Sequence, residues 1–317
     1  MNLLRRLVLP LAAALTLGVA HAAPPLLSPA ELKPLLSRPD VRVLDIRSPE
    51  AYAEGHVPGA LHAPYGAWRG PASSPGELPA LPKLTELVRR LGLTAQTHAI
   101  VVSTGDDPTD FGAAARVYWT LKVLGLRELS VLNGGVAAWE QAGLALETEA
   151  AKVAPSGFSP TIDTAMIVSR DEVRSRIESG QGRLVDARPA NFFRGETSHQ
   201  ASKVPGTLRG AVNFEHSSWF VPGTSTFVSV DEARRIAATA PVGSPEQGTV
   251  SFCNTGHWAA TNWFALSEVA GQKNVRMYAG SMVDWTQHHS SALMSNVPSR
   301  LDKILGDAKQ ELAKIRN

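Results

Sequence analysis

The chain has 317 residues, of which 31 are Lys or Arg, 29 are Asp or Glu, and one is Cys. This near-neutral balance argues against a nucleic-acid partner, which normally leaves a basic patch, and the single thiol excludes an internal disulfide. Residues 1–22 begin with a charged segment, continue with an apolar stretch and end in Ala-His-Ala, the pattern of a secretory signal peptide. We expect cleavage after Ala22, a periplasmic or secreted protein, and no membrane span in the mature chain.

The first half of the chain alternates β-rich runs with helical patterns. From residue 41 it reads VRVLDIRSPEAYAEGHVPGALHAP, and residues 66–82, rich in Gly and Pro, predict a loop. The runs LTELVRRLGL, HAIVVSTG, AAARVYWTLKVLG and LSVLNGGVAAW follow in that order and end at Trp139. Short apolar strands between helices predict an α/β fold whose mainly parallel sheet has helices on both faces.

The second half repeats these elements in the same order. It reads GRLVDARPANFFRG from residue 182, GTLRGAVNF from residue 206, GTVSFCNTG from residue 248 and VRMYAGSMVDW up to Trp285. A repeat of this length predicts two domains of ordinary size. We expect an N-terminal domain at 23–148, a linker at 149–163 and a C-terminal domain at 164–317, which ends in an amphipathic helix at 299–315.

Cys253 lies where the apolar run TVSF meets a helical pattern, and we call residues 253–258 the cysteine loop. Backbone N–H groups at such a turn point toward the loop centre, lower the pKa of a thiol and favour an anion built on its sulfur. The alternative is a buried structural thiol, because free cysteine packs as a small hydrophobic residue. The repeat around Cys253 favours the functional interpretation.

The sequence resembles the tandem-domain rhodaneses, the thiosulfate and 3-mercaptopyruvate sulfurtransferases, over nearly all of its mature length. LDIRSPEAYAEGHVPGA, VLNGGVAAW, LVDARPANFFRG and YAGSMVDW carry the resemblance, together with Cys253. It implies two tandem rhodanese-like domains, the first silent and the second catalytic. It also implies that Cys253 takes a sulfane sulfur from a small anionic donor and passes it from a persulfide to a thiophilic acceptor, such as cyanide or a thiol.

The resemblance and the loop chemistry together predict the residues that bind the donor. Loop amides would stabilise negative charge on sulfur, and His257 would either act as a cation near the donor and the thiol or point to solvent. Trp258 would wall the pocket or pack in the core. The family places an arginine near the anionic end of the donor, and Arg188 matches it; Arg194 is a candidate for the second arginine. The predicted donor-binding residues are Asn254, Thr255, Gly256, His257, Trp258, Arg188 and Arg194.

The first copy lacks a cysteine in the equivalent loop. Aligning IVVST with VSFC places Thr104 at or near the position of the cysteine, and a hydroxyl without a neighbouring base is a poor nucleophile. Asp106, Asp107 and Asp110 would repel an anionic donor. We therefore expect the first domain to be structural.

The loop sequence CNTGHW leaves the donor open. It is neither the basic loop typical of thiosulfate-preferring relatives nor the Gly-Ser-Gly of mercaptopyruvate-preferring ones, and we favour thiosulfate, with 3-mercaptopyruvate as the alternative. The related Cys-x5-Arg phosphatases are disfavoured because Ala259 stands where they need arginine. A persulfide carrier loaded by a protein partner remains open. We expect a monomer with no cofactor and no metal, since His288-His289 and Cys253 lack ligand spacing.

Overall fold

The computed structural model describes residues 23–288 and 291–299. The predicted signal peptide lies outside these residues, as does the predicted C-terminal helix except for Ser299. No helix among the described residues combines the length and hydropathy that a membrane span requires.

The first half builds, within its described residues, a five-stranded sheet in the order β1-β5-β4-β2-β3, and every neighbouring pair is parallel. Its elements are β1 (Leu26–Leu27), α1 (Pro29–Leu32), η1 (Lys33–Ser37), β2 (Val41–Asp45), α2 (Pro49–Glu54), β3 (Leu61–His62), η2 (Tyr65–Trp68), α3 (Leu81–Arg90), β4 (His98–Val102), α4 (Pro108–Val123), β5 (Leu129–Leu132) and α5 (Gly135–Gln141).

The second half repeats the arrangement. Its described residues form a four-stranded parallel sheet in the order β10-β9-β6-β8, beside an antiparallel pair of β11 and β7. Its elements are η3 (Thr164–Met166), α6 (Arg170–Ser179), β6 (Arg183–Asp186), α7 (Ala190–Phe193), β7 (Thr207–Leu208), β8 (Val212–Asn213), η4 (His216–Trp219), α8 (Val230–Thr239), β9 (Thr249–Phe252), α9 (Trp258–Trp263), the π-helical η5 (Phe264–Val269), β10 (Val275–Met277), α10 (Ser281–His288), η6 (Ser291–Leu293) and β11 (Met294–Ser295).

Both halves bury alternate side chains of each strand on opposite faces, as strand geometry requires. In β4, Ile100 and Val102 pack with α5 residues such as Trp139, whereas Ala99 and Val101 belong to the core that contains α3 and α4. The α/β prediction with helices on both faces of parallel sheets is therefore confirmed.

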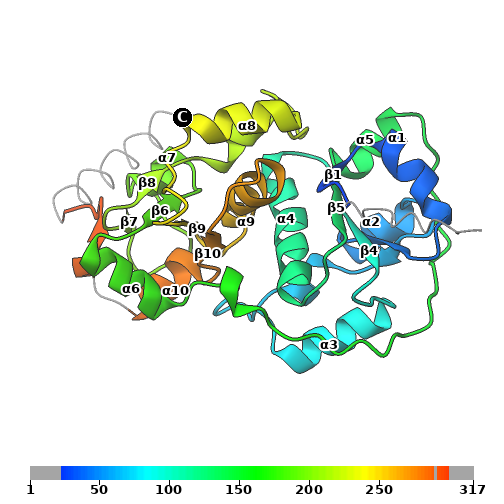
Figure 1. Ribbon diagram of the computed structural model, residues 1–317, viewed down its shortest axis with the longest axis horizontal. Helices are drawn as coiled ribbons and strands as arrows, with labels where there is room; N and C mark the ends of the chain where they lie inside the picture. The colour runs from blue at the N-terminus through cyan, green and yellow to red at the C-terminus, as the bar shows by residue number, and fades with distance from the viewer. Residues whose placement is uncertain (1–22, 289–290, 300–317) are drawn as a thin grey trace, which may run out of the picture.

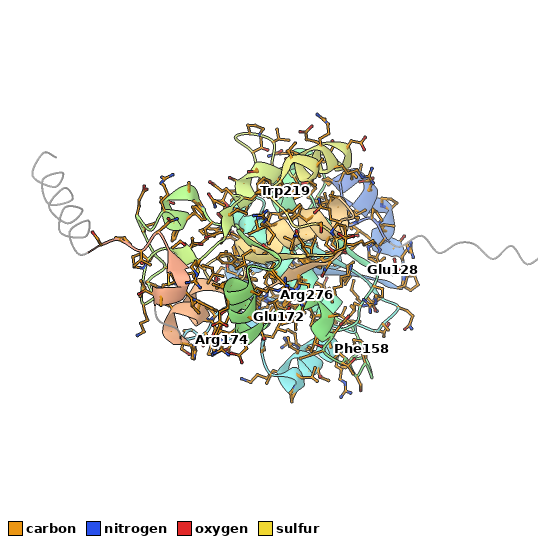
Figure 2. All side chains as sticks on the ribbon, turned by 60° about the vertical axis from the view of Figure 1, so that its left-hand side comes forward. Glu128, Phe158, Glu172, Arg174, Trp219 and Arg276 are labelled. Atoms are coloured by element: carbon orange, nitrogen blue, oxygen red, sulfur yellow. The ribbon has the colours of Figure 1, made fainter. Side chains whose placement is uncertain are left out.

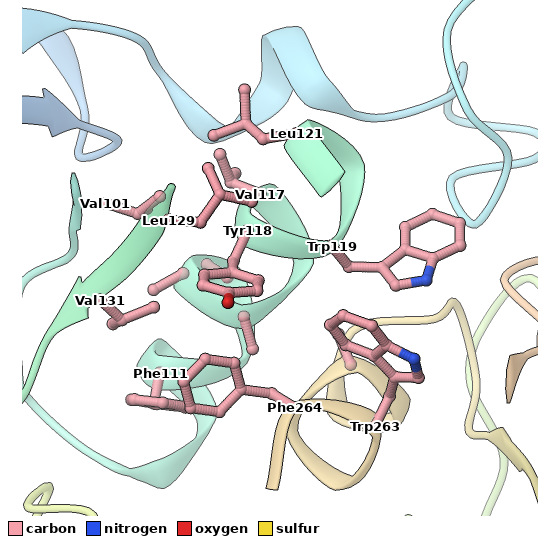
Figure 3. Packing of buried hydrophobic residues seen from close by; sticks show 14 of the residues in the cluster. Val101, Phe111, Val117, Tyr118, Trp119, Leu121, Leu129, Val131, Trp263 and Phe264 are labelled. Atoms are coloured by element: carbon pink, nitrogen blue, oxygen red, sulfur yellow. The ribbon is translucent and has the colours of Figure 1, made fainter. Parts of the chain in front are cut away.

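The two halves share one hydrophobic core along α4 and α9 (Figure 1). Phe111 and Tyr118 of α4 contact Phe264 with ring centroids 5.5 and 5.0 Å apart, and Trp263 lies beside them (Figure 3). Residues are buried on all sides of α4, which explains why the run AAARVYWTLKVLG shows no polar face. The helix that faces the second domain therefore brings first-domain side chains close to the cysteine loop.

Polar bonds fix the segments that flank this shared core. In the predicted linker, Phe158 O accepts from Arg89 Nε at 2.6 Å, so the linker lies against α3. In the second half, Arg276 of β10 and Glu172 of α6 form an ion pair at 2.5 Å (Figure 2). The first bond holds the linker against α3 of the first domain, and the second holds α6 against β10 of the second domain.

Candidate active site

Cys253 directly follows β9, and hydrogen bonds on both sides fix its backbone. Phe252 O accepts from Ala187 N at 2.9 Å, and Cys253 O accepts from Met282 N at 3.0 Å. The cysteine is 1% exposed. The thiol therefore lies at the carboxyl end of a central parallel strand, where open α/β sheets place their ligand sites.

The equivalent position of the first half is Ser103. Its carbonyl accepts from Val136 N at 2.9 Å, and the preceding carbonyl, of Val102, accepts from Ile46 N at 3.0 Å, which repeats the two bonds around the cysteine. We predicted Thr104 at or near this position. The hydrogen bonds place Ser103 there, one residue earlier, because β4 ends at Val102.

Ser281 ties the cysteine loop together. Its Oγ accepts from Cys253 N at 3.0 Å and from Gly256 N at 3.1 Å, and donates to Tyr278 O at 2.8 Å. Ser281 is fully buried and has a φ of 56°, a left-handed backbone conformation that residues other than glycine rarely adopt. The first copy has Gly135 at this point, so the second copy accepts backbone strain in exchange for loop contacts.

The remaining loop amides differ between the copies. Among the described residues, the amides of Asn254 and Thr255 have no hydrogen-bond acceptor. In the first copy, the equivalent amides of Thr104 and Gly105 donate to the Asp110 carboxylate at 3.3 and 2.6 Å. Burial raises the pKa of Asp110 despite these bonds. The same backbone turn therefore binds an anion in the first copy and leaves its donors free in the second.

Gly256 supplies the turn that closes the loop. Its φ is 68°, and a Cβ atom there would lie 2.5 Å from both Ala279 O and Arg116 Nη1. Only glycine combines this conformation with this close approach.

Arg188 lies beneath the loop and is 2% exposed. Its Nη2 donates to Asp186 Oδ2 at 2.6 Å and to Gly206 O at 2.8 Å, and its Nη1 donates to Asn254 Oδ1 at 3.3 Å. The guanidinium is thus charge-balanced by Asp186 and reaches the loop through one amide side chain. This geometry anchors Asn254.

The first copy contains the same arrangement. Arg47 Nη2 donates to Asp45 Oδ2 at 2.7 Å and to Gly55 O at 2.6 Å. Because the pair also occurs in the domain without a cysteine, these bonds hold the strand end in both copies. The bond from Arg188 to Asn254 is the element that the second copy adds.

Arg194 is directed away from this cluster. Its Nε donates to Glu196 Oε1 at 2.7 Å, and both side chains are more than half exposed. The surface ion pair occupies the guanidinium that we considered as a second arginine for the donor.

His257 bridges the two domains. Its Nδ1 lies 2.7 Å from Tyr65 Oη, and its Nε2 lies 2.7 Å from Thr109 O. A carbonyl can only accept, so Nε2 carries the proton and Nδ1 accepts from the tyrosine. Burial, followed by the positive charge of Arg69, lowers the pKa of His257 to about 3. Both expectations for His257 are therefore wrong: the ring is a neutral interdomain link, neither a cation nor directed to solvent.

Trp258 forms one wall of the loop. Its ring stacks on His216 with centroids 4.9 Å apart and meets Phe192 edge to face at 5.8 Å, and its Nε1 donates to Thr109 Oγ1 at 3.3 Å. Burial lowers the pKa of His216, so the stack is formed between uncharged rings. Trp258 fixes the loop against both domains.

Besides Thr109, three further first-domain residues at the loop were not predicted. Tyr65 contacts His257, Arg69 Nη2 donates to Thr255 O at 2.9 Å, and Arg116 Nη1 donates to Gly256 O at 3.2 Å. The sequence contained one signal for them, since Arg116 is a charged residue in the middle of a mainly apolar helical run, ahead of Lys122 near its end. Ser281 was also missed, although the change from Gly-Gly to Gly-Ser in the repeated motif marked it.

Comparison with known proteins identifies this architecture. The rhodanese-like domain family matches residues 28–142 and 169–288. A thiosulfate sulfurtransferase of Azotobacter vinelandii is 30% identical over 266 residues, which cover 84% of this chain and 95% of that protein. A probable 3-mercaptopyruvate sulfurtransferase of Pseudomonas aeruginosa is 30% identical, covering 82% and 94%. A sulfur carrier protein of Thermus thermophilus is 29% identical, covering 79% and 89%.

Solved structures share the same fold. SseA from Escherichia coli, whose structure is described as the rhodanese fold of 3-mercaptopyruvate sulfotransferases, superposes with a TM-score of 0.70 at 24% identity, covering 82% of this chain and 99% of that one. The chain belongs to the rhodanese family, with two copies of the domain. It is an enzyme of the sulfurtransferase class.

Proposed function

We propose that the protein moves a sulfane sulfur from thiosulfate, through a persulfide on Cys253, to a thiophilic acceptor such as cyanide or a thiol. One observation carries this proposal. The amides of Asn254 and Thr255 are free beside the cysteine, whereas the equivalent amides of the first copy hold the Asp110 carboxylate. A turn that binds a carboxylate in one copy suits an anion on sulfur in the other.

The reaction has two displacement steps. The Cys253 thiolate attacks the outer sulfur of thiosulfate, a new S–S bond forms, and the bond to the sulfonate sulfur breaks so that sulfite leaves with the electron pair. The acceptor then attacks the terminal sulfur of the persulfide. Cyanide leaves as thiocyanate, and the thiolate of Cys253 is restored.

The loop residues have distinct roles in this proposal. The amides of Asn254 and Thr255 stabilise the charge on sulfur in both steps. Gly256 closes the turn, while His257 and Trp258 hold the loop against the first domain. Arg188 is a positioning residue that acts through Asn254, and Arg194, paired with Glu196, has no part. The first domain, at 23–148, is catalytically silent and is joined to the second by the segment at 149–163.

We also propose that the protein is exported and monomeric. The signal-like residues 1–22 support cleavage after Ala22 and a periplasmic or secreted location. The resemblance to a sulfur carrier of Thermus thermophilus supports a second candidate, in which Cys253 carries a persulfide that a protein partner loads and unloads.

Intact-mass measurement after incubation with each donor tests the proposal. Thiosulfate is expected to add the mass of one sulfur atom to the wild-type protein and none to Cys253→Ser, and cyanide should remove it with release of thiocyanate. A gain from 3-mercaptopyruvate alone would replace the proposed donor. Loading by a persulfidated protein but by neither small donor would favour the carrier, and no sulfur gain from any of the three would refute the proposed chemistry.

A further inference from the structure

Arg116 is a buried cation without a carboxylate partner. It is 0% exposed, and its Nη atoms donate only to backbone carbonyls, those of Gly76, Glu77, Thr255 and Gly256, at 2.8 to 3.5 Å. Within the part of the chain that the structure describes, no acidic side chain forms an ion pair with it. Burying an unpaired charge is costly, so a buried guanidinium of this kind calls for a nearby anion.

Arg69 brings a second cation to the same place. Its Nη2 donates to Thr255 O at 2.9 Å, the same carbonyl that Arg116 Nη1 approaches at 3.5 Å, and its Nη1 donates to Tyr65 Oη at 2.9 Å. The side chain is half-buried, and the described residues give it no carboxylate partner either. Two like charges close to one carbonyl repel each other, and a nearby anion would offset that repulsion.

The anion available at this point is the sulfur of Cys253. Arg116 Nη1 donates to Gly256 O, and the amides of Gly256 and Cys253 donate to the same Ser281 Oγ, so the guanidinium lies against the turn that holds the thiol. The cations of the second domain do not fill this role, because Arg188 is balanced by Asp186 and His257 is neutral. The uncompensated positive charge near the cysteine therefore comes from the first domain.

We propose that the silent first domain supplies the positive charge for the sulfur chemistry of the second. Arg116, behind the cysteine loop, balances the negative charge on the sulfur of Cys253. Arg69, half-buried beside the loop, contacts the anionic end of the donor and selects anionic over neutral reactants. This inference rests on the proposed function for the identity of the donor, but the charge itself can be tested without sulfur transfer.

The test compares the alkylation of Cys253 by two reagents of similar size, anionic iodoacetate and neutral iodoacetamide. In both reactions an S–C bond forms and iodide leaves, so the ratio of the two rate constants reports the local charge. In Arg69→Gln we expect the rate constant for iodoacetate, divided by that for iodoacetamide, to fall by about tenfold. This is the effect of one unit charge about 4 Å from the anionic reagent near a hydrated surface. Arg69→Lys should retain most of the ratio.

Arg90→Gln is the matched control, because it removes the same charge from an exposed position on α3 of the same domain. Its ratio should equal that of the wild type at every salt concentration. The effect of Arg69→Gln should shrink in about 1 M salt, where the Debye length is about 3 Å. An unchanged ratio in Arg69→Gln, or an equal fall in Arg90→Gln, would overturn the assignment of Arg69.

Arg116 is tested by Arg116→Met and Arg116→Lys, with far-UV circular dichroism as the check on folding. In a folded Arg116→Met protein, alkylation by both reagents should slow together at pH 7, because the attacking sulfur anion loses the nearby positive charge of Arg116, and Arg116→Lys should restore the rate. A folded Arg116→Met protein with a wild-type rate would overturn the role of Arg116. Should neither variant fold, the Arg69 ratios alone decide the proposal. If thiosulfate adds no sulfur and the ratios still depend on Arg69, the proposed function fails and the charge assignment stands.

Discussion

Replacing Ser281 by glycine or alanine separates the geometry of the cysteine loop from the stability of the fold. The Oγ atom accepts from two amides and donates to one carbonyl. Each hydrogen bond contributes about 1 kcal/mol net, so Ser281→Ala should lower the free energy of unfolding by about 3 kcal/mol. Ser281→Gly loses the same bonds but relieves the strain of a φ of 56°, which is worth about 1–2 kcal/mol. The glycine variant should therefore be only about 1–2 kcal/mol less stable than the wild type.

Activity should follow a different order. Both variants release the amides of Cys253 and Gly256 from Ser281, so both should lose about 100-fold in the rate of persulfide formation, the lower end of the loss found when one preorganised donor is removed. Urea unfolding followed by tryptophan fluorescence measures the stability, and single-turnover mass measurement gives the rate. A glycine variant with wild-type activity, or an alanine variant more stable than the glycine variant, would refute this reasoning.

Two further predictions concern the contacts of the first domain. Burial raises the folded-state pKa of Asp110, so its charge costs stability above that pKa and costs nothing below the lower unfolded-state pKa. Asp110→Asn loses one of the two amide bonds at any pH, but the change that it causes in the urea midpoint should be more favourable at pH 7 than at about pH 4, and an equal change at both values would contradict the pKa assignment. Tyr65→Phe removes the hydroxyl from His257 Nδ1 and from Arg69, and should cost about 1–3 kcal/mol of stability. Urea unfolding with no loss in this variant would show that water replaces the hydroxyl.

The sequence predicted the parts of the protein that local patterns encode. The repeated runs that begin VRVLDIRSPE and GRLVDARPA located a strand of each parallel sheet, and the position of Cys253 after an apolar run located the loop. The alignment of IVVST with VSFC was off by one residue. A run of residues that favour strands does not mark which of them makes the last hydrogen bond of the ladder. Ser103 therefore lies at the position equivalent to Cys253, next to the Thr104 that we predicted at or near it.

The roles of residues that contact the other domain could not be predicted from the sequence. His257 is a neutral interdomain link because Tyr65 and Thr109, far away in the chain, bond to its two ring nitrogens. The same docking brings Arg69 to the loop, although its local sequence predicts only a surface loop. Local spacing does not encode such contacts, since they arise only when α4 packs on α9.

Asp110 gives the two copies different thermodynamic behaviour. Its carboxylate belongs to the chain, so its effective concentration at the amides of Thr104 and Gly105 does not depend on the solution. The amides of Asn254 and Thr255 bind only what diffuses to them, and an anion at 100 times its dissociation constant adds about 2.7 kcal/mol to the state that binds it. Protection of the cysteine loop against amide exchange is therefore tied to the supply of sulfur anions, whereas the loop of the first domain keeps the same order in their absence.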